Sequence, residues 1–586
     1  MGREDSHYRP GGSAEGGDNQ SSAKPVSGRV PVPDAQVLRP QSPTPPAAPT
    51  PGERADANHV PTASPLESAA VPVSPAPAGP PTNPPSQPPT SPPSQPPTGT
   101  APPPVAPASR RKLPLVLAAV LVLVLVAVGL VVIRPGPVGR WLGDAPATPT
   151  ATGTVESTPV AVLAAADTAA PPPTADGLRA TLEPLIGVTA LGSRVNLAVA
   201  DALTGEMLFD HGGGQGTVPA SVTKLLTAVT VLTARGPGHR IPTRAVAGTQ
   251  PGEVILVGGG DPTLAADAKG FYPGAASLTD LAAQVRTALG GAAPTSIVVD
   301  SSRYSGPVYG PGWDDDIPTG GYGGAITALM LDGARKNPKA GQGWAERVAE
   351  PDLFAGRAFA KLLGVPADAV RKGTAPPAPT ETTEATEPGG GGEPGAELGV
   401  VHSPPLIRLV DIMISDSDNI VAEALARQVA LARDRPASFA GAAAAMADVV
   451  AELALPTDGL LLADGSGLSR KNLISPVLLT ELLALAASPD RPELAAVFGG
   501  LPVAGWSGTL RDRYGAAPGT AAGVGVVRAK TGTLTRVHAI AGVVTTAEGR
   551  LLTFAVLTDD VPPDGMEPAR AALDRIAAAL AGCGCR

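Results

Sequence analysis

The sequence has few cysteines and histidines, which argues against a metal centre. It has two cysteines and six histidines among 586 residues. The histidines lie far apart, and Cys583 and Cys585 fall within the last four residues, so no metal-ligand spacing occurs. We therefore expect no metal and a fold that does not depend on disulfides. The cysteine pair is interpreted as an incidental frayed tail, with a local disulfide as the alternative.

Positive charge is also scarce. The net charge is −9, and no block of lysine and arginine is large enough to neutralise a run of phosphates, so nucleic acid is not an expected partner. The glycines of Gly258-Gly-Gly260 follow an apolar stretch, but Thr263 stands where a dinucleotide-binding loop needs its third glycine. Phosphate-loop and G-x-S-x-G motifs are absent, which excludes the commonest nucleotide enzymes and histidine-dependent hydrolases.

Proline and glycine are abundant but unevenly placed. Together the 69 prolines and 70 glycines make about a quarter of the chain. Residues 1–109 are rich in proline and contain the repeat P-P-S-Q-P-P-T twice. Such a segment has too little apolar surface to offset the entropy of ordering, so we predict a disordered cytoplasmic tail. It acts either as a spacer or as a docking segment for an unknown partner.

One long apolar run predicts a membrane anchor. Residues 113–133 carry no charge and, as a helix, would span about 30 Å, the thickness of a bilayer core. Arg110, Arg111 and Lys112 precede the run, which favours a cytoplasmic N-terminus and an extracytoplasmic remainder. A cleaved signal peptide is the alternative, but it would need an n-region of over a hundred residues. Residues 134–176 are then a flexible stalk.

The folded unit is predicted at 177–586. Strands are expected at 195–200, 206–209, 525–530, 538–546 and 551–557, with a closing helix at 567–580. Inserted subdomains are expected at about 246–400, and residues 373–397 are predicted to be a disordered acidic loop.

The first motif with chemical content is Ser221-Val-Thr-Lys224, at the start of an apolar helix. Serine needs a base to become a nucleophile, and a spacing of three places Lys224 on the same helix face. Lys224 can act as that base only when neutral, which burial and a second cation, Lys530, would favour. The motif alone is weak, because Ser21-Ser-Ala-Lys24 matches it in the tail.

The second motif is Ser417-Asp-Asn419, which precedes another apolar helix. We expect Ser417 to relay a proton to the leaving amine and Asn419 to hold the substrate amide and orient Lys224. Alternatively, these residues simply cap the helix, for which their types are well suited.

The third motif, Lys530-Thr-Gly-Thr533, is expected at the end of a strand. The Lys530 ammonium and the hydroxyls of Thr531 and Thr533 can hold a terminal carboxylate, and Gly532 lets a substrate approach the backbone. The backbone N–H groups of Ser221 and Thr533 are the expected oxyanion hole. A surface strand with a routine glycine is the alternative, yet three such motifs in this order indicate a serine acyl-transferase.

With these motifs the sequence resembles the penicillin-binding protein superfamily, and within it the D-alanyl-D-alanine carboxypeptidase/endopeptidase family S13. The wide gap between Ser221 and Ser417 is typical of that family. Further similar stretches lie at 258–264, 403–406, 464–472 and 507–510. The resemblance implies an α+β fold, with an antiparallel sheet flanked by helices, a helical subdomain and small inserted domains. It also implies peptidoglycan stem peptides and beta-lactams as ligands, and a reaction that requires no metal or organic cofactor. The resemblance further implies catalytic roles for Ser221, Lys224, Ser417, Asn419 and Lys530.

Three other functions remain as alternatives. A beta-lactamase would share the acylation step, but the E-x-x-L-N motif of class A enzymes is absent. A membrane-anchored sensor would acylate and then signal through its tail. A structural wall-binding protein is disfavoured because it has no need of two lysines near one serine.

Overall fold

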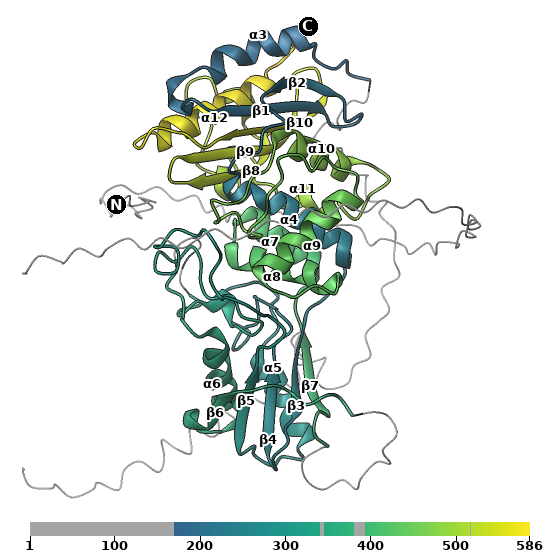
Figure 1. The fold of residues 1–586 in the computed structure, drawn as a ribbon, viewed down its shortest axis with the longest axis vertical. Helices are drawn as coiled ribbons and strands as arrows, with labels where there is room; N and C mark the ends of the chain where they lie inside the picture. The colour runs from purple at the N-terminus through teal and green to yellow at the C-terminus, as the bar shows by residue number, and fades with distance from the viewer. Residues whose placement is uncertain (1–168, 340, 342–344, 380–392, 516) are drawn as a thin grey trace, which may run out of the picture. The chain divides into compact units, whose positions relative to one another are not determined.

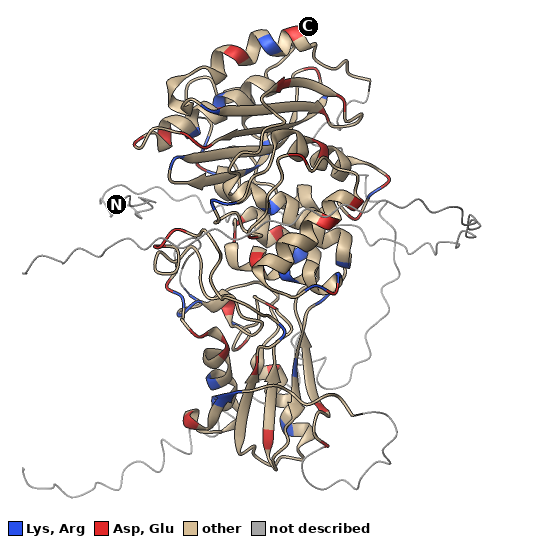
Figure 2. Ribbon diagram, in the orientation of Figure 1, with Lys and Arg blue, Asp and Glu red and all other residues tan. Residues whose placement is uncertain are grey.

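The computed structural model describes residues 169–339, 341, 345–379, 393–515 and 517–586 (Figure 1). The predicted tail at 1–109, the predicted anchor at 113–133 and the stalk up to residue 168 lie outside the described residues. Within the part that is described, none of the helices combines the length and the apolar character needed to span a bilayer. Acidic and basic residues are both scattered over the described ribbon (Figure 2).

The main sheet has five antiparallel strands in the order β2-β1-β10-β9-β8. Its strands join the two ends of the folded unit, because β1 and β2 come from its start and the other three from its end. The strand bounds are β1 Val195–Asp201, β2 Met207–His211, β8 Arg528–Leu534, β9 Val537–Thr545 and β10 Leu551–Thr558.

Side chains of the inner strands alternate between two hydrophobic cores. In β10, Phe554 and Val556 face the core under α3 (Ala175–Ile186) and α12 (Met566–Ala581). Ala555 and Leu557, one position along, face the core of the helical subdomain. This period of two is what a strand buried on both faces requires. The sheet is therefore a middle layer between two sets of helices (Figure 1).

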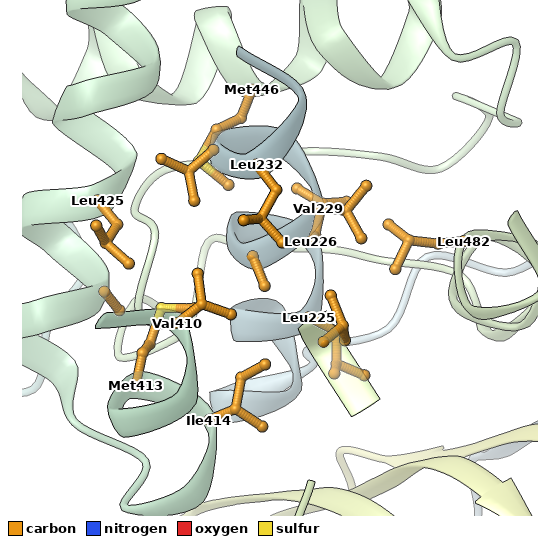
Figure 3. Packing of buried hydrophobic residues seen from close by; sticks show 14 of the residues in the cluster. Leu225, Leu226, Val229, Leu232, Val410, Met413, Ile414, Leu425, Met446 and Leu482 are labelled. Atoms are coloured by element: carbon orange, nitrogen blue, oxygen red, sulfur yellow. The ribbon is translucent and has the colours of Figure 1, made fainter. Parts of the chain in front are cut away.

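The helical subdomain surrounds α4, which is buried along most of its length. Figure 3 shows Leu225, Leu226, Val229 and Leu232 of α4 packed among side chains of the neighbouring helices. Because α4 follows directly after Ser221, this packing fixes the first motif in the interior. The helices are α4 Thr223–Arg235, α7 Leu406–Ser415, α8 Asn419–Ala432, α9 Phe439–Glu452, α10 Pro476–Ala487 and α11 Ala496–Gly500.

A second sheet lies between α4 and α7 in the sequence, in the order β6-β5-β4-β3-β7. Strands β4, β5 and β6 are parallel, while β3 pairs antiparallel with β4 and β7. Helices α5 and α6 pack in its core. The bounds are β3 Pro242–Ala247, β4 Glu253–Val257, α5 Leu278–Ala288, β5 Ser296–Asp300, α6 Pro351–Leu363, β6 Val370–Lys372 and β7 Glu397–His402. This sheet thus begins and ends close to the expected limits of the insertion, 246–400.

The prediction of a disordered loop at 373–397 is wrong at both ends. Gly373 N–H donates to the Val299 carbonyl, and Gly395 N–H donates to the Ala247 carbonyl. These bonds extend the edges of the second sheet, so backbone pairing orders residues whose composition is that of a loop. Residues 380–392 lie outside the described residues.

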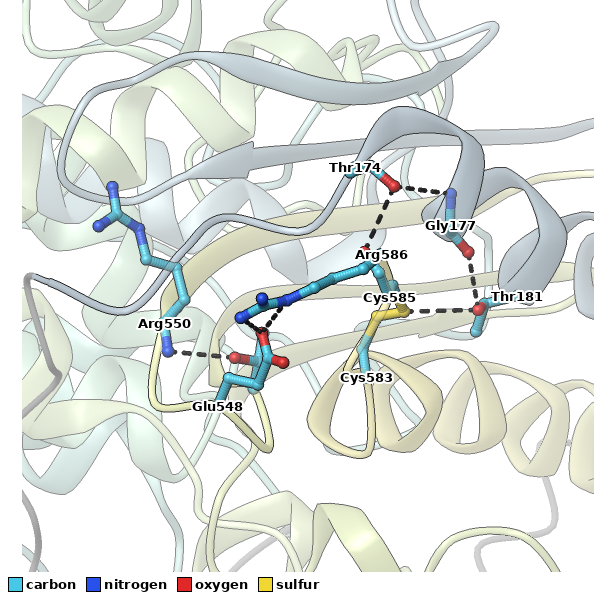
Figure 4. Close-up of a disulfide and its surroundings, with 9 residues drawn as sticks. Thr174, Gly177, Thr181, Glu548, Arg550, Cys583, Cys585 and Arg586 are labelled. Atoms are coloured by element: carbon cyan, nitrogen blue, oxygen red, sulfur yellow. Dashed lines mark hydrogen bonds and ion pairs between the residues drawn. A yellow bond between two sulfur atoms is a disulfide. The ribbon is translucent and has the colours of Figure 1, made fainter.

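The C-terminal tail is packed, which corrects the expectation of a frayed end. Cys583 is buried, and the structure joins it to Cys585 in a disulfide, the alternative expected from the sequence (Figure 4). The Cys585 carbonyl accepts the N–H of Thr174 at 2.8 Å. Residues just before 177 therefore belong to the folded unit and not to the predicted stalk, since the last residues of the chain hold them.

The predicted strands of the main sheet are confirmed with small shifts, and one shift matters. The strand expected at 525–530 runs from Arg528 to Leu534. Gly525 has a φ of 74° and stands in a turn instead. The third motif therefore lies within β8 and not at the end of a strand.

Candidate active site

The three motifs meet at one cleft of about 840 Å³. Each comes from a different element: Ser221 precedes α4, Ser417 and Asn419 stand at the start of α8, and Lys530 lies in β8. Ser221, Ser417, Asn419, Thr531 and Thr533 line the cleft, and both Lys224 and Lys530 are buried behind it.

Ser221 lies in a short 3-10 turn, Ala220–Val222, directly before α4. Ala220 has a φ of 46°, an unfavourable value for a residue with a side chain. Two contacts hold it there: the Thr223 hydroxyl donates to the Ala220 carbonyl at 2.8 Å, and Gly467 packs against the same carbonyl. A Cβ at position 467 would lie 1.9 Å from that oxygen. The turn therefore presents Ser221 at the wall of the cleft.

Lys224 reaches three oxygen atoms. Its Nζ lies 3.0 Å from Ser221 Oγ, 2.6 Å from Asn419 Oδ1 and 2.7 Å from the carbonyl oxygen of Ser466. A charged amino group has three N–H donors, so all of its donors find acceptors here. The predicted contact between Lys224 and Ser221 is thus present in the structure.

Burial lowers the pKa of Lys224 to about 8, while the carboxylates of Asp464, Asp418 and Glu423 oppose the shift. Burial also lowers the pKa of Lys530 to well below its ordinary value, and the charge of Lys224 lowers it further. The sequence led us to expect that burial and the charge of Lys530 would both lower the pKa of Lys224. Burial does lower the Lys224 pKa, whereas the repulsion between the two ammonium groups acts on the pKa of Lys530.

The residues of the second motif have separate tasks. Asp418 caps α8, since its Oδ1 accepts the N–H groups of Ile420 and Val421. Capping was the alternative considered for this motif, and it accounts for Asp418 alone. Asn419 points into the site: its Oδ1 accepts from Lys224, and its Nδ2 donates to the Tyr322 carbonyl at 3.0 Å.

Lys530 joins the third motif to the second. Its Nζ donates to Ser417 Oγ at 2.9 Å and to the Thr531 carbonyl at 2.7 Å. The hydroxyls of Thr531 and Thr509 lie 2.8 Å apart, which ties β8 to the 3-10 turn Gly508–Leu510. The two serines of the cleft therefore each contact a buried lysine.

The three sequence motifs do not identify several residues that support the site. The Ser466 and Tyr322 carbonyls act through the backbone, which no side-chain motif reveals. Asp464 organises the loop around Ser466, with its two oxygens accepting from Trp313, Ser466, Gly467, Ser469 and Asn472. The only signal for Asp464 and Ser466 was the resemblance at 464–472, to which the sequence assigned no catalytic part, and no signal marked Tyr322 or Trp313.

A five-stranded antiparallel sheet between two helical layers, with two buried lysines each contacting a serine, defines a serine hydrolase of the penicillin-binding protein and beta-lactamase type. The penicillin-binding protein 4 (dacB) of Haemophilus influenzae shares this fold, with a TM-score of 0.53 and 23% identity. The match covers 68% of this chain and 97% of that one. This likeness confirms the predicted α+β fold.

The model of the D-Ala-D-Ala carboxypeptidase 3 (S13) family matches residues 178–362 and 337–580. A carboxypeptidase from Mycobacterium tuberculosis is 39% identical over 75% of this chain and 90% of its own length. The D-alanyl-D-alanine carboxypeptidase of Actinomadura sp. strain R39 is 30% identical over 64% of this chain and 79% of its own. The chain belongs to the S13 family and is a serine-type D-Ala-D-Ala carboxypeptidase, as the sequence predicted.

Proposed function

We propose that Ser221 is the nucleophile of this carboxypeptidase and that neutral Lys224 is its general base. One observation carries the proposal: Lys224 Nζ lies within 3.0 Å of Ser221 Oγ and of two oxygens that only accept hydrogen bonds. The two acceptors are the Ser466 carbonyl and Asn419 Oδ1. Since Asn419 Nδ2 donates to the Tyr322 carbonyl, its oxygen is the atom that faces Lys224.

These acceptors orient the lone pair of the amine. A neutral lysine has two N–H groups and one lone pair. If both N–H groups go to the two acceptors, the lone pair faces the third neighbour, the Ser221 hydroxyl. Ser221 Oγ can then attack the substrate carbonyl while its proton passes to Lys224 Nζ.

Ser417 and Lys530 serve the leaving group. After attack, the bond between the carbonyl carbon and the nitrogen of the terminal D-alanine breaks, and that nitrogen needs a proton. Ser417 Oγ lines the cleft and contacts Lys530 Nζ, so it can pass its proton on and be reprotonated. D-Alanine leaves as the amine, and the remaining peptide stays as an ester on Ser221. Water then hydrolyses the ester to give a peptide acid and free Ser221.

β8 provides the binding edge for the substrate. We assign the terminal carboxylate to Lys530 and the hydroxyls of Thr531 and Thr533, and the oxyanion to the backbone N–H groups of Ser221 and Thr533. A Cβ on Gly532 would lie 3.2 Å from the Ser221 nitrogen, so β8 passes close to the backbone of the nucleophile.

The same steps apply to a cross-linked peptide, where the leaving amine is a side chain of the neighbouring stem, and to a beta-lactam, whose ring nitrogen cannot diffuse away. We therefore include endopeptidase activity and penicillin sensitivity in the proposal. A related fold has been solved in complex with a beta-lactam, the penicillin-binding protein 4 of Haemophilus influenzae.

Intact mass spectrometry of the full-length chain with penicillin tests the nucleophile. We expect one adduct per chain, persisting for minutes or longer and absent in Ser221→Ala. An adduct that clears within seconds would indicate a beta-lactamase, and a folded wild-type chain without any adduct would contradict the proposal. Release of D-alanine from a pentapeptide over many turnovers separates a peptidase from a sensor, which would release none after acylation.

We further propose that residues 113–133 anchor the enzyme in the cell membrane, with the catalytic unit outside. The uncharged apolar run and the basic residues before it support this topology. Fractionation of cells that express the full chain tests it: we expect the protein in the membrane fraction, its catalytic unit accessible to protease from outside. Recovery of the intact chain in the soluble fraction would contradict the anchor.

A further inference from the structure

The backbone around Ser466 lies between the two helices that supply the catalytic side chains. On one side, the Thr227 hydroxyl of α4 donates to the Gly465 carbonyl at 2.6 Å. On the other side, Gly465 packs so closely against α8 that a Cβ there would lie 2.5 Å from the Cβ of Ala426. The Ser466 carbonyl, one residue on, accepts from Lys224. The position of this short segment therefore decides where one of the three partners of Lys224 lies.

Glu423 of α8 holds that segment. One of its oxygens, Oε1, accepts the N–H of Gly465 at 3.1 Å and the N–H of Ser466 at 2.8 Å. Its other oxygen accepts from Arg427 Nη1 at 3.1 Å. Both side chains are only 1% exposed, so water cannot replace these bonds.

We propose that Glu423 is a positioning residue for catalysis: by binding the N–H groups of Gly465 and Ser466, it holds the Ser466 carbonyl against Lys224 and so directs the lysine lone pair to Ser221. The inference rests on the proposed role of Lys224 as the base. It adds a residue that touches no substrate and lies outside the three motifs, although it stands only four positions after Asn419 in the same helix.

Glu423 also acts through its charge. The ionisable groups around Glu423 and Lys224 are Asp464 in the loop, Asp418 and Arg427 on α8, and Lys530 beyond Ser417. Burial and the nearby Asp464 raise the pKa of Glu423 to about 7, while Arg427 lowers it. Because the Glu423 carboxylate raises the pKa of Lys224, removal of this charge should lower the pH at which Lys224 becomes neutral.

A purely structural role for Glu423 is the competing explanation. Arg427 lies over the rings of Phe439 and Tyr304, and its buried ion pair with Glu423 would then serve only to hold the fold together. The two explanations differ in what they change. A structural anchor alters the fraction of folded protein, whereas a positioning residue alters the acylation rate of each folded molecule and its dependence on pH.

The test follows acylation of the full-length chain by a fluorescent penicillin over a range of pH in Glu423→Ala and Glu423→Gln. In Glu423→Ala the carbonyl of Ser466 loses its support, and we expect the rate to fall on the order of 10²-fold, as for a small displacement of a catalytic group. In Glu423→Gln the amide oxygen still accepts, so we expect a loss within about tenfold. In this variant the acidic limb of the rate profile should move to lower pH.

Gln428→Ala is the matched control. Gln428 is equally buried on the same helix and donates to the Gly259 carbonyl at 3.0 Å, away from Lys224. We expect it to lower the melting temperature and to leave the acylation rate and its pH profile unchanged. Wild-type rates and an unshifted profile in folded Glu423→Ala and Glu423→Gln would overturn the proposal.

If neither single variant folds, the double variant Glu423→Leu/Arg427→Met decides, because it removes the acceptor and leaves no unpaired buried charge. A wild-type rate of acylation in this variant would then overturn the proposal. The result is distinguishable from failure of the proposed mechanism. Glu423 variants still contain Ser221 and should reach one adduct per chain at long times, whereas an adduct that also forms on Ser221→Ala would refute the mechanism itself.

Discussion

Gly532 packs directly on the turn that carries Ser221. A Cβ at position 532 would lie 2.6 Å from the Pro219 carbonyl oxygen and 3.2 Å from the Ser221 nitrogen. Distances of this size leave no room for a methyl group, so the closeness of β8 to the nucleophile depends on the absence of a side chain.

Gly532→Ala should therefore displace β8 from Ser221. We expect the penicillin acylation rate to fall on the order of 10²-fold, with one adduct per chain still reached slowly. Stopped-flow fluorescence with labelled penicillin measures the rate. Gly238→Ala is the control, since a Cβ at 238 would have nothing within 4 Å. Equal rates in the two variants would show that β8 tolerates the methyl group.

The rate of acylation should depend on pH through Lys224. Below its pKa the amine is protonated and has no lone pair, so it cannot take the Ser221 proton. Because burial lowers that pKa to about 8, the rate should rise with pH and level off above about 8. A rate of acylation that is flat between about pH 6 and pH 9 would exclude Lys224 as a base with this pKa.

Ser417→Ala should impair proton delivery to the leaving amine. General acid catalysis contributes about 10² to 10⁴ in rate, and we expect a loss in that range for release of D-alanine from a pentapeptide. Ser415→Ala, two residues earlier, offers a control in which the hydroxyl contacts only Asp416 at 3.4 Å among its described side-chain bonds. Near-normal turnover by Ser417→Ala would assign the proton transfer to another group.

Tyr272 links the inserted segment to the second motif. Its hydroxyl donates to Asp418 Oδ2 at 2.7 Å, and both residues are buried. Tyr272→Phe should lower the free energy of unfolding by about 1–3 kcal/mol, because a buried carboxylate oxygen loses its partner. It should also slow acylation, since Ser417 and Asn419 flank Asp418. Urea unfolding and penicillin labelling measure the two effects.

Tyr304→Phe is the comparison for that variant. The Tyr304 hydroxyl lies 3.4 Å from the carbonyls of Gly260 and Ala424. Tyr304→Phe therefore removes weaker hydrogen bonds than Tyr272→Phe does. We expect a smaller change in stability and none in the labelling rate. If both tyrosine variants label at the wild-type rate, Tyr272 only stabilises the fold.

The sequence predicted which motif side chains meet at the cleft better than it predicted the residues that support them. The motifs mark Ser221, Asn419 and Lys530 by side-chain type and order, because the proposed mechanism needs a hydroxyl, an amide and an ammonium group. The Ser466 carbonyl contributes through the backbone, where any residue type would serve. Its position depends on Glu423 and Asp464, which approach from other elements, and such long-range contacts leave no periodic signal in the sequence.

The strands of the main sheet were predicted with unequal accuracy for a physical reason. β9 and β10 are buried on both faces and rich in valine, leucine and alanine, so their run of apolar residues marks them. The edge strand β8 contains the polar residues Lys530, Thr531 and Thr533, and its predicted start was three residues early. At Gly373 and at 395–396, local composition indicates a loop, while hydrogen bonds to distant strands order the backbone.

The backbone hydrogen bond between Thr174 and Cys585 brings the start of the catalytic unit next to its end. The C-terminal residues can pack this closely only because position 177 is a glycine: a Cβ there would lie 2.6 Å from the Cys585 carbonyl carbon (Figure 4). Ala170, four residues before Thr174, is also held by a distant part of the chain, because its carbonyl accepts a hydrogen bond from Arg550. Entry and exit of the polypeptide thus share one small area of surface. A circularly permuted enzyme, with its ends joined there and new ends opened at an exposed turn, should keep both the fold and the cleft.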